Sequence, residues 1–219
     1  MMPQYKEVIK KNLFYFISSL LLFLAALFVC ITYGKAEGFY LLNPYHNNIV
    51  STIFIYLTWL GDGLFCVAVG LLLFIFNKRY LSILVISSYL LSGLIAQILK
   101  YFIVEARPAV YLKDSTYQYF IENVTLHNYH AFPSGHTASA FALATVFAVT
   151  KNNTWISLIL LIIAAMVGYS RIYLGQHFLI DVFGGAVVGV AAAIICLCIF
   201  NPDNKFFKKK IRYISSNTL

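Results

Sequence analysis

The sequence reads WISLILLIIAAMVGYSRIYLGQHFLIDVFGGAVVGVAAAIICLCIF from Trp155 to Phe200. Two apolar runs flank one short polar stretch, Ser170–Asp181, in a chain in which only 11% of the residues are charged. Apolar runs of this length predict two membrane-spanning helices. The polar stretch is therefore expected where a membrane meets water, and its Arg171, His177 and Asp181 are candidates for a catalytic face.

The spacing of these three side chains indicates a chemistry. Arg171 is a fixed cation that suits an anionic substrate. His177 and Asp181 are four residues apart, which places them on one face of a helix if the segment is helical. A carboxylate beside an imidazole can orient the ring, so we expect the pair to act together.

The composition excludes an ordinary soluble protein. Hydrophobic residues make up 61% of the 219 residues, against roughly 45–50% in soluble domains. The formal net charge of +8 does not indicate nucleic-acid binding, because the cations cluster between apolar runs rather than along an amphipathic face. An integral membrane protein is the class that fits, with the bilayer as its partner and no nucleic acid.

Six apolar runs predict an all-α, polytopic membrane protein with six transmembrane helices. We interpret residues 1–219 as one integral membrane domain, with its motifs in residues 100–181 and a basic cytoplasmic tail at 203–219. The expected spans are 13–33, 49–76, 81–104, 135–151, 155–170 and 180–200.

Glycines and polar residues punctuate these spans. Lys35–Asn48 is expected to form a loop. Gly61-Asp62-Gly63 interrupts the second span, and we interpret Asp62 as a helix-packing or kink site rather than as a catalytic residue. The sixth span carries three glycines that should allow close contact with other helices, namely Gly184, Gly185 and Gly189.

The distribution of cations predicts the orientation. With six spans, both termini lie on one side, and eleven of the sixteen Lys and Arg residues fall on that side. Because basic residues collect on the cytoplasmic side of membranes, both termini should be cytoplasmic. Ser170–Asp181 then faces the periplasm or another exoplasmic space.

Two further polar clusters fall on the predicted outer face. Lys100 and Arg107 are seven residues apart, or two helical turns, so both can point at one spot beyond the third span. Pro133–His136 begins the fourth span, where a helix N-terminus favours an anion and Gly135 allows a close backbone approach. Each cluster alone has a structural explanation, but three cations, two histidines and a carboxylate on one face favour a catalytic site for an anionic substrate.

The three clusters together resemble the type 2 phosphatidic acid phosphatase (PAP2) superfamily. Its pattern is Lys, six residues, Arg-Pro, then Pro-Ser-Gly-His, then Ser-Arg, five residues, His, three residues, Asp. Every position is present here. The matching residues are Lys100, Arg107, Pro108, Pro133, Ser134, Gly135, His136, Ser170, Arg171, His177 and Asp181. The resemblance implies a PAP2/haloperoxidase-like helical core.

The resemblance also implies a role for each residue. His177 is the expected nucleophile, Asp181 orients it, and His136 is the general acid and base. No carboxylate cluster suited to magnesium lies near the motifs, so we predict metal-independent hydrolysis without a cofactor. The residues expected to bind the substrate phosphate are Lys100, Arg107, Ser134, Gly135 and Arg171.

The expected substrate is a lipid phosphate in the inner (plasma) membrane, and the motifs leave its identity open. Candidates are lipid A 1-phosphate, undecaprenyl diphosphate, phosphatidylglycerophosphate and phosphatidic acid. The Tyr-rich loop 109–132 either admits the headgroup or anchors in the interface. We expect no chemical role for its His127 and His130. The alternatives are a vanadium haloperoxidase-like oxidase, whose known members are soluble, and a non-enzymatic transporter or assembly protein, which needs no intact phosphate pocket.

Overall fold

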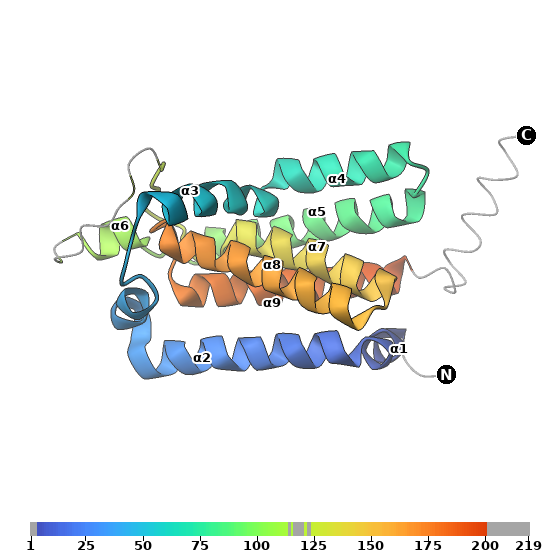
Figure 1. Ribbon diagram of the computed structural model, residues 1–219, viewed down its shortest axis with the longest axis horizontal. Helices are drawn as coiled ribbons and strands as arrows, with labels where there is room; N and C mark the ends of the chain where they lie inside the picture. Colours follow the sequence, from blue (N-terminus) through green and yellow to red (C-terminus); the bar gives the residue numbers. More distant parts are fainter. Residues whose placement is uncertain (1–3, 114, 116–120, 122–123, 201–219) are drawn as a thin grey trace, which may run out of the picture.

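The computed structural model describes residues 4–113, 115, 121 and 124–200, and these residues contain helices, turns and loops but no strand (Figure 1). The all-α prediction is confirmed for this part of the chain, and the predicted tail at 203–219 lies outside it. The helices are α1 (Gln4–Lys11), α2 (Leu13–Leu42), α3 (Asn48–Leu57), the 3₁₀ helix η1 (Thr58–Gly61), α4 (Gly63–Ile75), α5 (Arg79–Phe102), α6 (Pro108–Tyr111), α7 (Gly135–Lys151), α8 (Thr154–Tyr173) and α9 (Leu179–Ile199).

Helix α7 is the centre of the bundle, packed against α5, α8 and α9. Its small residues let neighbours approach closely. The predicted glycine contacts are confirmed: a Cβ added at Gly185 would collide with the carbonyl oxygen of Ser134, and one at Gly189 with that of Ala138. The side chain of Phe132 occupies the equivalent space at Gly184. The start of α7 is therefore held tightly against the first turns of α9.

The long helices support the prediction of an integral membrane protein. Helices α2, α5, α8 and α9 are long and apolar enough to cross a bilayer, and α3 with η1 and α4 forms a broken fifth candidate bent by 56°. Large apolar side chains on α2 face outward, with Phe28 67% and Ile31 76% exposed. Such a surface suits contact with lipid, and the chain is an integral membrane protein. With 17 residues, α7 is shorter than the other long helices.

The expected loop over Lys35–Asn48 is wrong for most of its length. Gly34 adopts φ 69°, the chain turns there, and helix continues to Leu42. Phe39, fully buried, packs its ring 5.7 Å from that of Phe178. This tertiary packing outweighs the polar composition of the segment. Lys35 also pairs with Glu105, so the end of α2 is fixed to the segment that follows α5.

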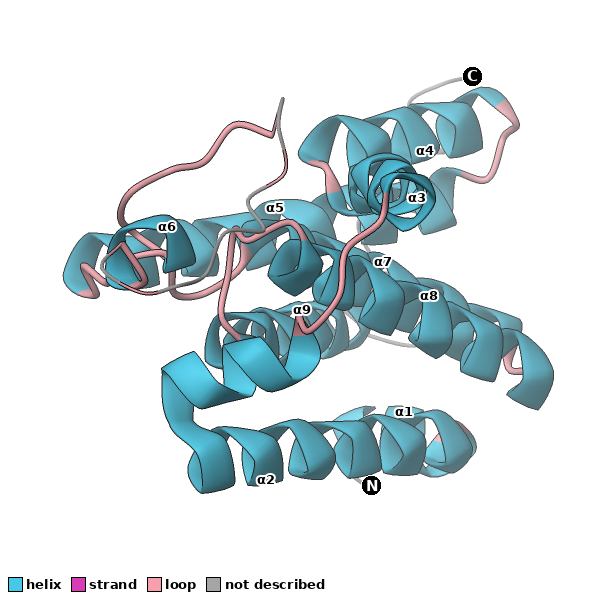
Figure 2. Ribbon diagram, turned by 60° about the vertical axis from the view of Figure 1, so that its left-hand side comes forward, coloured by secondary structure: helices cyan, strands magenta, loops and turns pink. Residues whose placement is uncertain are grey.

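The basic turns and the predicted site lie at opposite ends of the bundle. In Figure 1, α1 and the turn between α4 and α5 lie at the right-hand end, while α6 and the kinked end of α2 lie at the left. Figure 2 shows α6 beside the end of α5, together with the loops that surround it. The three polar clusters all belong to this second end.

Candidate active site

Arg107 reaches the site through an extended segment. Helix α5 ends at Phe102, so the expectation that two helical turns separate Lys100 from Arg107 is wrong. The residue before a proline is forced toward extended backbone, and Arg107 has φ −81° and ψ 165° ahead of Pro108. Its Nε donates to the carbonyl oxygen of Tyr129 at 3.1 Å, and its Nη1 to that of Gln176 at 3.4 Å. The guanidinium therefore links the first cluster to the third.

The second cluster begins α7, as predicted. Ser134 is the N-cap, fully buried, and its Oγ accepts hydrogen bonds from the backbone N–H and the hydroxyl of Thr137. The Ser134 backbone N–H donates to the carbonyl oxygen of Asp181 at 2.9 Å, which joins the second cluster to the third. Gly135 and His136 follow in the first turn, and a third of the His136 side chain is exposed.

The third cluster is a helix, a turn and a second helix. Arg171 lies in the last turn of α8, and its carbonyl oxygen accepts the backbone N–H groups of Gln176 and His177. Because α9 starts at Leu179, His177 precedes the helix, and the condition for a helix face shared with Asp181 is not met. They still meet: Asp181 reaches back to cap α9 at the N–H of Phe178, at 2.9 Å. This leaves its Oδ2 3.5 Å from His177 Nδ1.

The three clusters converge electrostatically on His177. Its side chain is almost completely buried, and this burial, with the nearby cations Arg107, Arg171 and Lys100, holds the pKa of His177 well below its usual value. The imidazole is therefore neutral at physiological pH, with a free electron pair on nitrogen. Among the described residues, His177 Nδ1, Arg171 Nε and Asp181 Oδ1 are buried without a hydrogen-bond partner. Buried polar atoms without a partner are uncommon in folded proteins, and a catalytic role is one explanation for them.

The sequence model of the PAP2 superfamily matches residues 81–205, more than half of the chain. The chain belongs to the PAP2 superfamily. This match confirms the resemblance and the prediction of a PAP2-type hydrolase of phosphoric esters or diphosphates.

Two of the similar proteins are phosphatases by name. The chain is 24% identical over 186 residues to the undecaprenyl-diphosphatase of Sulfolobus acidocaldarius, covering 82% of this chain and 87% of that protein. It is 28% identical over 162 residues to phosphatidylglycerophosphatase B of Bacillus subtilis, covering 67% and 71%. The crystal structure of Aquifex aeolicus LpxE superposes with a TM-score of 0.62 at 34% identity, covering 74% of this chain and 94% of that chain.

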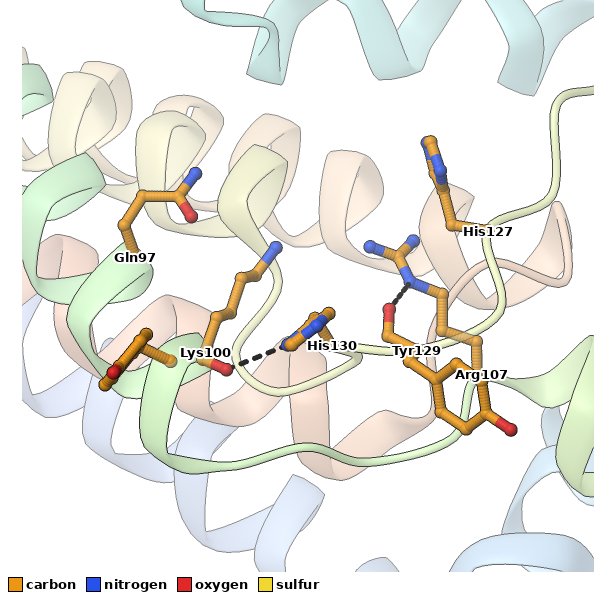
Figure 3. A pocket seen from close by; sticks show the side chains of 7 residues that line it. Gln97, Lys100, Arg107, His127, Tyr129 and His130 are labelled. Carbon is orange, nitrogen blue, oxygen red and sulfur yellow. Dashed lines mark hydrogen bonds between the residues drawn. The ribbon is translucent and has the colours of Figure 1, made fainter.

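An open cavity of about 430 Å³ adjoins the PAP2 motifs (Figure 3). Lys100 and Arg107 line it, and their charged ends point to the same side of the backbone at residues 129–130. His130 Nδ1 lies 2.9 Å from the carbonyl oxygen of Lys100. The remaining lining residues are Gln97, Tyr101, His127 and Tyr129.

Sequence reasoning missed several residues at this PAP2 site. His127 and His130 were expected to have no chemical role, and that remains a prediction although both line the cavity. Gln97 gave no signal, because a single amide in an apolar helix matches no motif. Asp62 was interpreted as a kink, and the bend at this position confirms that, yet its Oδ2 also lies 3.6 Å from His136 Nε2. In the part of the chain that the structure describes, no three His, Cys, Asp or Glu side chains form a metal-binding group.

Proposed function

We propose that the protein is a lipid phosphate phosphatase that hydrolyses a phosphomonoester or pyrophosphate headgroup. The observation that carries this proposal is the convergence of Lys100, Arg107 and Arg171 on a buried, neutral His177. Three cations suit a phosphate dianion, and a neutral imidazole suits attack on its phosphorus. Asp181 fits the role of orienting His177, because its Oδ2 lies 3.5 Å from His177 Nδ1.

The first step transfers the phosphoryl group to the protein. The electron pair of His177 attacks phosphorus, the P–N bond forms, and the bond from phosphorus to the lipid oxygen breaks. His136 gives a ring proton to that oxygen, so an alcohol or a shorter lipid phosphate leaves. Lys100, Arg107 and Arg171 hold the non-bridging oxygens while charge redistributes.

The second step returns the protein to its starting state. Neutral His136 takes a proton from water, the water oxygen attacks phosphorus, and the P–N bond breaks. Orthophosphate leaves, and its departure restores His177 as a neutral imidazole. Asp181 keeps His177 in one tautomer through both steps and stabilises its positive charge in the phosphorylated form. The Ser134 hydroxyl and the Gly135 backbone N–H complete the phosphate-binding set.

The proposed substrate is one of four lipids, namely lipid A 1-phosphate, undecaprenyl diphosphate, phosphatidylglycerophosphate and phosphatidic acid. The names of the Sulfolobus and Bacillus relatives support the second and third. All four present a phosphate at headgroup level, where the cavity at Lys100 and Arg107 is open. The residues proposed for binding contact the phosphate rather than the lipid. Only an assay of each lipid therefore distinguishes the four candidates.

The proposed location is the inner membrane, with six spans, cytoplasmic termini and a periplasmic site. Helix α7 is the sixth span: its 17 residues rise about 26 Å, close to the hydrocarbon thickness of about 30 Å. The cations Lys78, Arg79 and Lys151 lie at the ends of α5 and α7 that are away from the site. This separation supports the positive-inside orientation.

Phosphate release tests the proposal directly. Purified protein in detergent micelles is assayed against the four lipids, beside His177→Ala and the control Lys151→Ala, which removes a cation at the far end of α7. Wild type and control should release phosphate from at least one lipid, and His177→Ala should release none and form no acid-labile phosphoprotein. Near-normal turnover by His177→Ala would refute the nucleophile, and no release by wild type from any of the four would refute the function.

A further inference from the structure

A fourth segment of the chain supports the site from outside the three motifs. Residues 58–62 form the break between α3 and α4, where η1 packs against α7 and α8. A Cβ on Gly61 would lie 2.5 Å from the carbonyl oxygen of His136, and one on Gly63 would collide with the hydroxyl of Tyr89. At Gly61 only glycine permits the approach, because the neighbour is a backbone atom. Gly61 therefore places the break directly beside the first turn of α7, while Gly63 faces Tyr89 of α5.

Two polar side chains of this break lie close to Arg171 and His136, two residues of the proposed mechanism. Thr58, 7% exposed, accepts a hydrogen bond from Arg171 Nη1 at 2.7 Å. Asp62 Oδ2 lies 3.6 Å from His136 Nε2. The other carboxylate oxygen of Asp62 accepts the N–H of Leu64 at 2.8 Å and caps α4. One oxygen thus fixes the carboxylate to a helix end, and the second faces the imidazole.

We propose that Asp62 is a positioning residue for His136, and that Thr58 fixes Arg171 in the same way. This inference rests on the proposed function, since it assigns support to the proposed acid and to one phosphate ligand. The carboxylate of Asp62 orients the His136 ring and stabilises it as imidazolium, the form that protonates the leaving group. The hydroxyl of Thr58 holds the Arg171 guanidinium toward the phosphate.

The charges around His136 explain why a carboxylate is needed there. The charged groups that act on it are Arg171, Asp62, Lys100 and Arg107. Three of these are the cations proposed to bind substrate phosphate, and each disfavours a positive charge on the imidazole. Asp62 is the one carboxylate in this set, and it opposes them. Its negative charge therefore favours the protonated imidazole that the proposed first step uses.

The capping of α4 gives Asp62 a competing structural role, so the variants must separate the two. Asp62→Asn keeps a side-chain oxygen for the N–H of Leu64 but removes the charge, because Asn and Asp are equivalent as N-caps. Asn153→Ala is the matched control, since Asn153 caps α8 in the same way at 3.0 Å and lies next to Lys151, at the far end of α7. Asn153→Ala should alter stability alone.

The readout is the dependence on the leaving group. For each variant, kcat/KM is measured on a short-chain phosphatidic acid, whose alkoxide leaves poorly, and on p-nitrophenyl phosphate, whose phenolate needs little protonation. An opposite charge at this distance changes the ratio of protonated to neutral imidazole at the neighbouring histidine about tenfold or more. Asp62→Asn should therefore lose about tenfold in kcat/KM on phosphatidic acid and much less on p-nitrophenyl phosphate. The alkaline limb of its pH–activity profile should move to lower pH.

The outcomes distinguish this inference from the proposed function. Wild type without activity on any lipid phosphate refutes the function. If wild type is active and His136→Ala is selective for the leaving group, Asp62→Asn equal to wild type on both substrates overturns the positioning role. Equal loss on both substrates overturns it as well, because that is the result of a purely structural defect.

Thr58 has its own test. Thr58→Val preserves the shape of the side chain but leaves a buried Arg171 N–H without its acceptor, so kcat/KM should fall by a similar factor on both substrates. Thr58→Ser restores the hydroxyl and should recover most of the activity. If Thr58→Val matched wild type, or Thr58→Ser stayed as low as Thr58→Val, the role of Thr58 would be wrong.

Discussion

Replacing Gly185 by alanine places a methyl group where α9 passes the first turn of α7. The added Cβ would collide with the carbonyl oxygen of Ser134, and it would lie 3.0 Å from the Thr137 Cβ and 3.3 Å from the backbone nitrogen of Ala138. Two of these three neighbours are backbone atoms, so no side-chain rotation relieves the contact. Ordinary contacts need about 3.5–4.0 Å, so the two helices must separate by about an ångström.

This separation disturbs the site because the contact between α7 and α9 positions residues of both helices in the proposed mechanism. Ser134 caps α7 and His136 lies in its first turn, while His177 leads into α9. A misplacement of about 1 Å in a catalytic constellation costs about 100-fold in rate, and overpacking a tight contact costs about 1–3 kcal/mol in stability. We therefore expect Gly185→Ala to lose about 100-fold in kcat and to unfold at a lower temperature.

Gly93→Ala is the matched control. Gly93 lies in the middle of α5, and a Cβ there would meet no atom within 4 Å. The substitution should leave activity unchanged and stabilise the protein by about 0.5–1 kcal/mol, because alanine loses less backbone entropy in a helix. Thermal unfolding in detergent and phosphate release are measured on both variants. Gly185→Ala with wild-type kcat and an unchanged unfolding temperature would refute the close approach of α7 and α9.

Two further predictions concern pH and metal. Because burial and the neighbouring cations lower the pKa of His177, its nucleophilic form persists as the pH falls through the usual histidine value of about 6.5. The kcat at saturating substrate should lose its nucleophile only well below that pH, and an acidic limb attributable to His177 at or above 6.5 would contradict this. Activity should also survive dialysis against EDTA, and a loss that magnesium restores would show that the metal-independent reaction is wrong.

The spans could be predicted from the sequence because burial in a bilayer leaves a local signal. The sixth run was expected at 180–200, and α9 occupies Leu179–Ile199, since apolar length alone sets such boundaries. The helix after Gly34 could not be predicted in this way. Its polar residues suggested a loop, and the packing of Phe39 on Phe178 involves residues 139 positions apart. A contact of that kind leaves no periodic pattern in either segment.

The site shows a second limit, in which the correct pairing was expected from the wrong geometry. The four-residue spacing of His177 and Asp181 predicted a shared helix face. The structure brings them to 3.5 Å because Asp181 caps its own helix at Phe178, one residue after His177. An acidic residue in the first turn of a helix serves both arrangements equally well. Spacing therefore identified the partners without identifying the backbone that joins them.

Asp62 is the case in which one residue carries two functions and the sequence displays only one. An acid between glycines inside an apolar run is explained completely by a kink, and the 56° bend confirms that explanation. Gly61 also lets the break approach the carbonyl oxygen of His136, which lies 75 residues further along the chain. A helix break in a membrane exposes a cap, and a capping carboxylate has a second oxygen to offer. The features that made Asp62 look structural are thus the ones that allow it to act on His136.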